Sequence, residues 1–451
     1  MCHYARAMTG RTPPDETGTD RDAGLPTPAD RLHAIVEQGL CTGCGICQSV
    51  AGSEVVRVQK VVNGYERPVV VGDLDHATVD RIYEVCPGTR VEGLPDRLVD
   101  DATHVDPVWG PWRRIVRAWA ADPVVRHEGS TGGVLTALAI YLLESGRVDL
   151  VLHARPSTTE PTFGESHLSA TPADVMAGVG ARYGPTAPLV GVDEVLGMGR
   201  PFAFIGKPCD VAALRNLARP DPRVDRLVPY MLTPVCGGYM PPAATAAFLE
   251  RMGIDPSEVT GLRYRGRGCP GPTRIETADG STEAHYLDFW GEDESMWMLP
   301  WRCKVCPDGI GEAADLAAAD TWPGGSPTRE GSVDDPGTNA VLARSAAGLE
   351  LLEAAERDGA LVIERDATID EMSDYQPHQV RKKHAVASRY LGMADEGRIV
   401  PATARLRLDE LAAAMPADEQ ARQRDGTRVR IGRGKATEPR PEAARPEVQG
   451  E

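Results

Sequence analysis

The sequence predicts a mixed α/β protein with α+β elements, in which a small N-terminal ferredoxin-like cap precedes a larger α/β core. Three observations support this prediction. A cysteine-rich loop and a Val-rich hairpin follow each other near the N-terminus, apolar strand patterns alternate with helical segments further along, and 451 residues suffice for two or three domains. We expect a disordered leader at 1–30, the cap at 31–100, a linker at 101–120, the core at 121–395 and a largely disordered extension at 396–451.

The composition indicates a soluble globular protein, with 41% hydrophobic and 25% charged residues. The net charge of −17 argues against a nucleic-acid partner, since phosphate binding needs a basic surface. No apolar run is long enough to span a bilayer, so we expect no direct membrane insertion. Ten cysteines, several of them paired as C-x2-C, are too few for a disulfide scaffold and favour metal binding in the reducing cytoplasm.

The cap is predicted from its cysteines. Cys41, Cys44 and Cys47 have C-x2-C-x2-C spacing, which lets one tight loop reach three corners of a [4Fe–4S] cluster. Cys86, which a proline follows, supplies the fourth corner. A zinc site or unlinked cysteines are the alternatives, but zinc favours paired C-x2-C arms.

Three elements should frame this loop. Residues 30–39 are typical of a short helix that leads into it. Two Val-rich runs on either side of Asn63-Gly64 give the strongest short hairpin signal. A helix that ends at Cys86 closes the cap, and Trp109 and Trp112 of the linker could pack the cap onto the core.

In the core, a loop of small residues leads straight into an apolar helix at 134–143. The loop residues are Ser130, Thr131, Gly132 and Gly133. Free backbone N–H groups and the positive end of the helix would meet here, which suits a phosphate or pyrophosphate. The alternative is an N-cap at Ser130 or Thr131, with the glycines serving only as packing contacts.

Apolar strands are predicted at 150–154, 202–205 and 228–235. Cys209 follows the second strand at the start of a helix and Cys236 follows the third, so both thiols should lie at one edge of a sheet. With the C-x2-C pair of Cys303 and Cys306 they make four thiols, enough for a second cluster. Buried structural cysteines and a zinc knuckle are the respective alternatives.

The rest of the core carries weaker signals. Residues 338–366 fit one more strand–helix–strand piece. The basic cluster from Arg381 to His384 suits an acidic ferredoxin or a phosphorylated cofactor, although a solvated helix face explains it as well. His127 and His285 are candidate proton donors for catalysis, and a structural histidine is the commoner alternative for each.

Eight motifs follow one another between residues 38 and 395. They are Cys41-Thr-Gly-Cys-Gly-Ile-Cys47, Val85-Cys-Pro-Gly88, Gly129-Ser-Thr-Gly-Gly-Val-Leu-Thr-Ala-Leu138, Gly206-Lys-Pro-Cys-Asp-Val-Ala-Ala-Leu-Arg215, Tyr264-Arg-Gly266, Arg302-Cys-Lys-Val-Cys-Pro-Asp308, Ala314-Asp-Leu316 and Asp320-Thr-Trp322. Together they resemble the coenzyme F420 hydrogenase/dehydrogenase beta-subunit family. Several motifs in one consistent order make the resemblance far more specific than any single motif.

The resemblance implies a flavin-binding core: an enzyme or enzyme subunit with FAD and one or two [4Fe–4S] clusters that links one-electron and two-electron partners. It places FAD near the Ser130–Gly133 loop, Arg182, Tyr183, Lys207, Thr338 and Asn339. The partners that it implies are ferredoxin or a partner redox subunit, together with coenzyme F420 or a similar hydride carrier. A homo-oligomer is compatible with it.

The sequence departs from the family pattern in a few places. Asp210 follows Cys209 where many relatives have glutamine, and an acidic side chain beside a cluster thiolate would lower its reduction potential. Thr131 keeps the hydroxyl of a common serine. The extra cysteines of the chlorophyll-reducing branch are missing near the first cluster. Three functions stay open: an oxidoreductase for coenzyme F420 or a similar carrier, a ferredoxin-dependent reductase of a tetrapyrrole or other organic substrate, and a non-catalytic electron-relay subunit.

Overall fold

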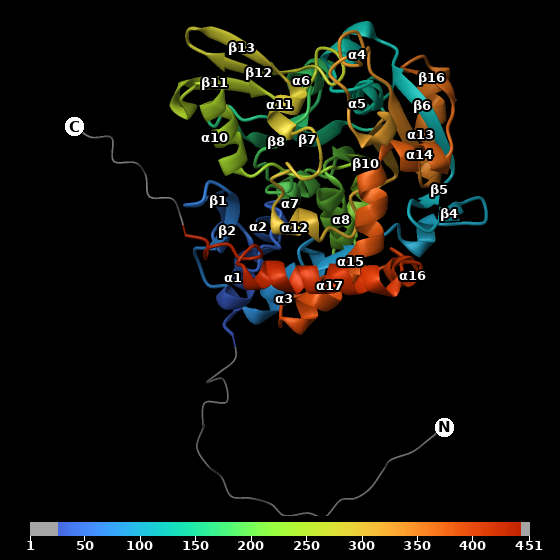
Figure 1. Ribbon diagram of the computed structural model, residues 1–451. Coiled ribbons are helices and arrows are strands. Elements are labelled where there is room, and N and C mark those ends of the chain that lie inside the picture. Colours follow the sequence, from blue (N-terminus) through green and yellow to red (C-terminus); the bar gives the residue numbers. More distant parts are fainter. Residues whose placement is uncertain (1–25, 443–451) are drawn as a thin grey trace, which may run out of the picture.

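The computed structural model describes residues 26–442, and Figure 1 shows them folded around one large sheet. The first 25 residues of the expected leader lie outside the described residues, as do residues 443–451. Within the described part of the chain, no helix is long and apolar enough to cross a membrane.

The cap consists of α1 (Pro28–Glu37), α2 (Ile46–Ala51), β1 (Val56–Lys60), β2 (Glu66–Val70) and α3 (His76–Val85). Thr27 and Asp30 form a capping box that starts α1. Strands β1 and β2 pair antiparallel, so the hairpin predicted around Asn63-Gly64 is confirmed. Helix α3 ends directly before Cys86, as predicted.

Eight strands form the central sheet, in the spatial order β16 (Leu361–Asp366), β6 (Arg114–Ala120), β15 (Asn339–Ala343), β14 (Leu316–Asp320), β10 (Tyr230–Pro234), β9 (Phe202–Ile205), β7 (Leu150–Pro156) and β8 (Gly164–Ser169). The four strands from β14 to β7 are parallel, and antiparallel strands flank them on both sides. The α/β prediction is confirmed in the form of a mixed sheet, and the three apolar strands predicted in the core are β7, β9 and β10.

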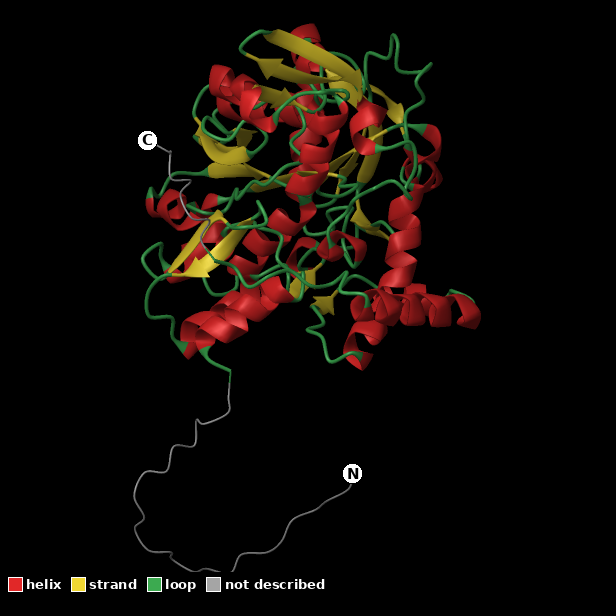
Figure 2. Cartoon of the chain, turned by 60° about the vertical axis from the view of Figure 1, so that its left-hand side comes forward, coloured by secondary structure: helices red, strands yellow, loops and turns green. Residues whose placement is uncertain are grey.

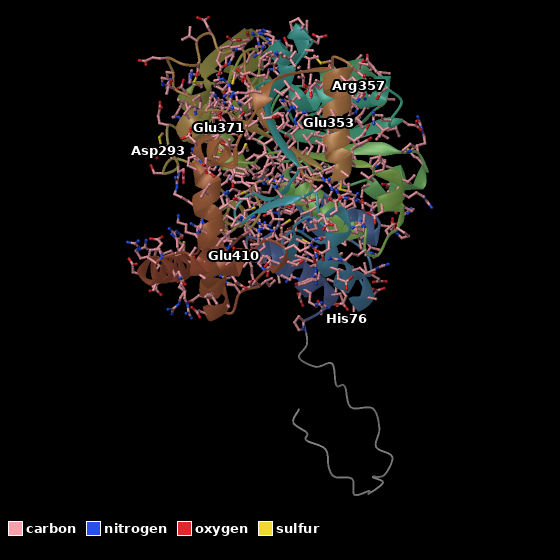
Figure 3. The ribbon with its side chains drawn as sticks, turned by 90° about the vertical axis from the view of Figure 1, so that its right-hand side faces the viewer. His76, Asp293, Glu353, Arg357, Glu371 and Glu410 are labelled. Carbon is pink, nitrogen blue, oxygen red and sulfur yellow. The ribbon has the colours of Figure 1, made fainter. Side chains whose placement is uncertain are left out.

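Helices cover both faces of the sheet. One face packs against α5 (Val134–Glu144), α6 (Pro172–Ala177) and α13 (Ala346–Arg357), with α4 (Pro123–Glu128) directly ahead of α5. The other face packs against the cap, α7 (Val192–Gly197), α8 (Pro208–Leu217), α9 (Arg223–Leu227) and α14 (Ile369–Tyr375). Because side chains alternate along a strand, Val151 faces the first layer while Leu150 and Leu152 face the second. Glu353 and Arg357 lie on the exposed side of α13 (Figure 3).

A smaller antiparallel sheet stands beside the main one, at the upper left of Figure 1. It contains β11 (Val259–Arg263), β12 (Pro272–Thr277) and β13 (Gly280–His285), with α10 (Pro242–Arg251), α11 (Tyr286–Trp290) and the short helix α12 (Trp301–Lys304) nearby in sequence. Helices α15 (Pro377–Asp395), α16 (Leu408–Ala413) and α17 (Ala417–Gly432) close the molecule next to the cap (Figures 1 and 2). Two short strand pairs complete the sheets of the described fold: β3 (Arg90–Glu92) pairs with β17 (Ala402–Ala404), and β4 (His104–Asp106) pairs with β5 (Gly110–Trp112). The described residues also contain three short 3-10 helices, at Asp96–Leu98, Pro256–Glu258 and Pro323–Gly325.

Residues 101–120 do not form the expected linker. They include β6, which is the second strand of the central sheet and has Ile115 and Val116 buried on its opposite faces. Trp109 is fully buried in the core, where its Nε1 donates a 3.0 Å hydrogen bond to Ser373 Oγ. This tryptophan therefore packs inside the core and does not fasten the cap to it.

The C-terminal extension also differs from the expectation of disorder, since it contains β17, α16 and α17. Helix α17 packs along α15, with Thr427 and Ile431 as its buried residues. Arg424 forms a 2.6 Å ion pair with Asp395 of α15. Two buried side chains and several ion pairs thus hold a helix whose polar composition gives little signal in the sequence.

A buried carboxylate, Asp315, ties the sheet to the helices behind it. It accepts hydrogen bonds from the Met231 N–H (2.8 Å) and the Ser345 hydroxyl (2.6 Å), and it pairs with Arg215 at 3.0 Å. Asp315 is only 3% exposed. Removing it would therefore leave a guanidinium group buried without its counter-charge.

We expect Asp315→Ala to lower the free energy of unfolding by about 3 kcal/mol or more, because breaking a buried ion pair leaves an uncompensated charge. Denaturant unfolding of the purified protein measures this loss. The control Asp149→Ala removes an exposed 3.1 Å pair with Arg200, and it should cost less than about 1 kcal/mol. Equal losses in the two variants would contradict the structural role of Asp315.

Candidate functional site

The candidate site lies where the parallel strands end. Asp320 ends β14, Cys236 follows β10 and Lys207 follows β9, all at one edge of the sheet. Sheets of this kind usually bind ligands in the crevice outside the carboxyl ends of their strands. A cleft of about 320 Å³ opens at this edge. Of the residues predicted to contact a cofactor, those that line the cleft are Ser130, Thr131, Gly133, Arg182, Tyr183, Lys207 and Asn339.

The predicted glycine loop forms one end of the cleft. Helix α5 starts at Gly133, which has a φ of 73° and no side-chain cap, so neither Ser130 nor Thr131 is its N-cap. Leu135 and Thr136 of the first helical turn line the cleft. The Val134 N–H bonds to Asn339, and the next N–H groups of the turn, which the helix itself does not pair, suit an anion.

Gly132 has a packing role next to the cleft. A Cβ atom at this position would lie 3.0 Å from the carbonyl oxygen of Ala118 and 2.9 Å from Asn339 Oδ1. Asn339 in turn accepts a hydrogen bond from the Val134 N–H (3.4 Å) and donates one to the Ala319 carbonyl (3.1 Å). The loop is therefore pressed onto the ends of β6, β14 and β15, which fixes where α5 begins.

Arg265 fixes the same loop, and no role was predicted for it. It donates hydrogen bonds to the Ser130 carbonyl (2.7 Å), Thr131 Oγ1 (3.0 Å) and Asp320 Oδ1 (3.0 Å). Its guanidinium group lies 4.8 Å from the ring centre of Trp322. In the sequence, Arg265 is marked only as part of the Tyr264-Arg-Gly266 motif, which does not show which residues it contacts.

Aromatic side chains also line the cleft, close to Arg265 and the loop that it holds. We call Tyr183, Tyr286, Trp290, Trp297 and Trp322 the aromatic wall. The rings of Tyr183 and Trp290 lie 4.7 Å apart, and Tyr286 stacks on Trp290 at 6.3 Å with an interplanar angle of 12°. Flat aromatic surfaces of this kind suit a planar ring system. Sequence reasoning did not assign the tryptophans a role, although Trp290, Trp297 and Trp301 cluster in a chain with only 5% aromatic residues.

His378 meets the aromatic wall edge-on, with its ring 5.2 Å from that of Trp297. Burial lowers the pKa of His378 to about 3, and nearby Lys382 and Arg381 act in the same direction. The imidazole of His378 is therefore neutral at any ordinary pH, and it adds no charge to the cleft beside Trp297.

Arg182 brings a positive charge to the cleft without a matching carboxylate. Its Nη1 donates to the Ala181 carbonyl at 2.9 Å, while its buried Nε atom has no hydrogen-bond partner. Burial lowers the pKa of Arg182 to about 10, and the charge of Arg263 adds to this effect. A buried guanidinium with spare donors is the group that a phosphate would satisfy.

The first thiol set contains Cys41, Cys44, Cys47 and Cys86, all of them free. Backbone N–H groups point at two of the sulfur atoms: Gly43 donates to Cys41 Sγ (3.4 Å) and Gly88 donates to Cys86 Sγ (3.3 Å). Burial, together with the nearby charge of Cys41, raises the pKa of Cys86 to about 12. The four predicted ligands thus lie close enough to influence one another, in a buried place where a free thiolate would be costly.

The second thiol set contains Cys209, Cys236, Cys303 and Cys306, and all four line one small cavity of about 40 Å³. Burial, together with Cys303, raises the pKa of Cys236 to about 12. Cys41 of the first set also lines this cavity, so the two sets are neighbours. Lys207, Cys236 and Gly238 line both the cavity and the large cleft. We call these three residues the shared wall.

The number of thiols matches what a cluster requires. Each of the four irons of a [4Fe–4S] cluster takes its own thiolate, and each of the two neighbouring sets contains four thiols. Among the described residues, no group of three or more His, Cys, Asp or Glu side chains was found that could hold a single metal ion.

Arg302 joins the two thiol sets. This residue is 3% exposed, and it donates hydrogen bonds to the Pro87 carbonyl at 2.7 and 3.2 Å, directly after Cys86. Burial by itself lowers the pKa of Arg302, but the nearby Cys306 and Cys209 raise that pKa and so favour the charged guanidinium. The side chain therefore places a positive charge between the sets.

Four of the residues predicted to contact the flavin or to act in catalysis do not line the cleft: Gly132, Thr338, His127 and His285. His285 caps α11, since its Nδ1 accepts a hydrogen bond from the Leu287 N–H at 3.1 Å. His127 accepts a hydrogen bond from the Gly268 N–H through its backbone carbonyl. Thr338 accepts one from the Thr321 hydroxyl at 3.0 Å through its carbonyl. In these contacts all three act as structural residues.

The fold and the site together define an α/β protein with an anion-accepting, aromatic-walled cleft that adjoins two four-thiol sets. Residues 115–192 match the N-terminal part, and residues 199–368 the C-terminal part, of the beta subunit of coenzyme F420 hydrogenase/dehydrogenase. The chain belongs to this family, as its motifs predicted.

Two characterised relatives are similar to the chain over part of their length. The F420-dependent formate dehydrogenase 1 subunit beta of Methanococcus maripaludis is 28% identical over 250 residues, which cover 53% of this chain and 58% of that protein. The coenzyme F420-dependent sulfite reductase of Methanocaldococcus jannaschii is 24% identical over 188 residues, which cover 42% of this chain and 26% of that protein. The chain thus spans less than two thirds of either relative.

A solved structure has a similar fold. It is a chain of the F420-reducing [NiFe] hydrogenase complex from Methanosarcina barkeri, studied by xenon derivatization. The TM-score is 0.50 and the identity 20%, and the match covers 64% of this chain and 97% of that one. The likeness supports the α/β architecture described above.

Glu66 is a buried carboxylate between the cap and the core. Its Oε2 atom is buried and has no hydrogen-bond partner. Burial raises the pKa of Glu66 to about 7, although the charges of Lys207 and Arg67 act against this rise. The folded state therefore prefers the protonated carboxyl, so wild-type stability falls as the pH rises from about 4.5 to about 7.

We expect Glu66→Gln, which is neutral at every pH, to match the wild type at pH 4.5 and to be more stable at pH 8 by up to about 3 kcal/mol. Thermal unfolding at both pH values measures the difference. Glu353→Gln on the exposed side of α13 serves as the control, and it should show no such pH-dependent gain. A gain for Glu66→Gln that is the same at both pH values would refute the burial of a protonated carboxyl.

Proposed function

We propose that the chain is an iron–sulfur flavoprotein oxidoreductase that passes electrons between [4Fe–4S] clusters and coenzyme F420, or a similar hydride carrier, through FAD. The observation that carries this proposal is the shared wall: Lys207, Cys236 and Gly238 line both the cleft and the cavity of the second thiol set. A cofactor in the cleft and a cluster on these thiols would therefore both border on these three residues. The relatives named above, both F420-dependent oxidoreductases by name, support the choice of carrier.

The lining of the cleft offers groups for both the pyrophosphate and the ring system of FAD. The start of α5 and the Arg182 guanidinium are the groups that would hold the pyrophosphate, since both offer unpaired donors. The aromatic wall would take the isoalloxazine ring. FAD, when bound, supplies the exchange between one-electron and two-electron chemistry. The chain itself orients the cofactor and keeps water from its buried face.

The two thiol sets are the proposed ligands of two [4Fe–4S] clusters, one in the cap and one next to the cleft. The chain lowers the cost of buried thiolates in two ways. Backbone N–H groups of Gly43 and Gly88 donate to sulfur atoms, and Arg302 places a positive charge between the sets. His127 and His285 have no part in this proposal, because neither lines the cleft.

The electron donor or acceptor on the cluster side is proposed to be a ferredoxin or a partner redox subunit. Two of the matches carry names that refer to a subunit or a complex, which favours a partner subunit.

Anaerobic purification followed by iron, sulfide and flavin assay tests the cofactors, and titration with reduced coenzyme F420 tests the substrate. We expect about eight iron atoms and one FAD per chain, and bleaching of the cluster absorbance on addition of the reduced carrier. Full cofactor content without bleaching would remove coenzyme F420 as the substrate. Clusters without flavin would leave only an electron-relay role.

Gly132→Ala tests whether the glycine loop holds the flavin. The new Cβ would meet the Ala118 carbonyl and the Asn339 side chain, so the loop must move away from its position at the start of α5. We expect flavin content and coenzyme F420-dependent activity to fall by roughly tenfold or more, which corresponds to ~1.4 kcal/mol, while iron content is retained.

Gly197→Ala is the matched control, since a Cβ at that position meets nothing within 4 Å. It should retain flavin, iron and activity. Wild-type flavin content in the Gly132→Ala variant would show that the cofactor does not depend on this loop.

A further inference from the structure

Arg67 of β2 is a second buried guanidinium at the thiol sets, and it is only 1% exposed. It lines the same cavity as Cys41 and the second thiol set. A Cβ added to Gly43, in the middle of the first cysteine loop, would lie 3.4 Å from its Nη1 atom. Its guanidinium group lies 4.1 Å from the ring centre of Tyr65, which holds it in place. The positive charge thus sits against the loop that carries Cys41.

The counter-charge of Arg67 comes from the far end of the described chain. Glu438 accepts two hydrogen bonds from it, from Nε at 2.8 Å and from Nη2 at 3.0 Å. Bidentate pairs of this kind fix both partners in one geometry. The segment that carries Glu438 follows α17 and lies against the cap, where its N–H donates to the Glu37 carbonyl at 3.1 Å. Figure 1 shows this red segment beside the blue cap.

The two charges of the Arg67–Glu438 pair act in opposite ways on the first thiol set. Arg67 lies against the loop that carries Cys41. Burial opposes the guanidinium charge, and the Cys41 charge is the main influence that favours it. Glu438 pairs with the same guanidinium group at 2.8 Å and offsets part of its charge. A positive charge stabilises the more negative, reduced form of a nearby cluster, and a negative charge does the opposite.

We propose that Arg67 raises the reduction potential of the cluster on the first thiol set, and that Glu438 of the C-terminal segment limits this rise. The inference rests on the cluster assignment of the proposed function. It adds that the C-terminal segment controls how readily the cap accepts an electron. It does not depend on which carrier occupies the cleft.

The test is a redox titration, followed by electron paramagnetic resonance, of the anaerobically purified full chain. Arg67→Gln should shift the potential of the first cluster downward, because the positive charge is lost while Glu438 remains. Glu438→Gln should shift it upward, because the guanidinium is then uncompensated. Arg67→Lys keeps the charge and should stay near the wild-type potential.

Arg440→Gln is the matched control, because it removes a pair with Asp30 (2.7 Å) in the same segment, and Arg440 does not line the thiol cavity. Its potential should equal that of the wild type. Shifts of Arg67→Gln and Glu438→Gln in the same direction, or no shift in either, would overturn the proposal. If Arg67→Gln fails to assemble its clusters, the potentials of Glu438→Gln and Arg67→Lys still test the proposal.

The readout separates this inference from the proposed function. Wild-type protein without iron would remove both. If the clusters are present but their potential is the same in the Arg67 and Glu438 variants as in the wild type, only this inference is wrong, whether or not the chain reduces coenzyme F420. If the potentials shift as predicted but the protein shows no coenzyme F420 activity, the inference is supported and coenzyme F420 is ruled out as the substrate.

Discussion

Eight thiols, two of them buried and six half-buried, gather between the cap and the sheet, and the rest of the site depends on that constraint. Burial raises the pKa of Cys86 and Cys236 to about 12, so thiolates at these positions need compensating positive charge. Iron would supply most of it. The chain adds Arg67 from the cap and Arg302 from α12, both almost fully buried next to the sulfur atoms. Burial disfavours both guanidinium charges, while Cys41 favours the charged form of Arg67 and Cys306 and Cys209 favour that of Arg302.

Lys207 of the shared wall also bears on one expectation about the reduction potential of the second cluster. The sequence places Asp210 after Cys209, and we expected this acidic side chain to lower the potential of the second cluster. In the structure Asp210 pairs with Lys207 Nζ at 2.8 Å, and its carboxylate also accepts a hydrogen bond from the Lys207 N–H at 3.0 Å. The lysine charge offsets the aspartate charge beside the thiol. Lys207 and Asp210 therefore act as a nearly neutral unit that fixes the start of α8 between the cavity and the cleft.

The sequence predicted the features that depend on local spacing. The cysteine loop, the hairpin at Asn63-Gly64, and the strands before Lys207 and Cys236 all lie as predicted, because turn residues and period-two patterns are local signals. Features that depend on distant partners were missed. Strand β6 lies in a stretch that was read as a linker, and its place in the sheet is set by β15 and β16, more than 200 residues later in the chain. Arg265 was missed for the same reason, because its partners are Ser130, Thr131 and Asp320.

The family match covers residues 115–368, while the cap and the last helices lie outside it. These two outer parts contact each other directly: β3 pairs with β17, Arg440 pairs with Asp30, and Glu438 pairs with Arg67. Cys44 and Cys47 share one hydrophobic cluster with Val386 of α15 and Ile431 of α17. The first thiol set is thus surrounded both by parts outside the match and by matched residues such as Leu189 and Arg302, whose N–H groups donate to the Cys44 and Pro87 carbonyls. Arg67 and Glu438 lie outside the match and neither lines the cleft. This ion pair can therefore change the electrostatics around the first thiol set without altering the lining of the cleft.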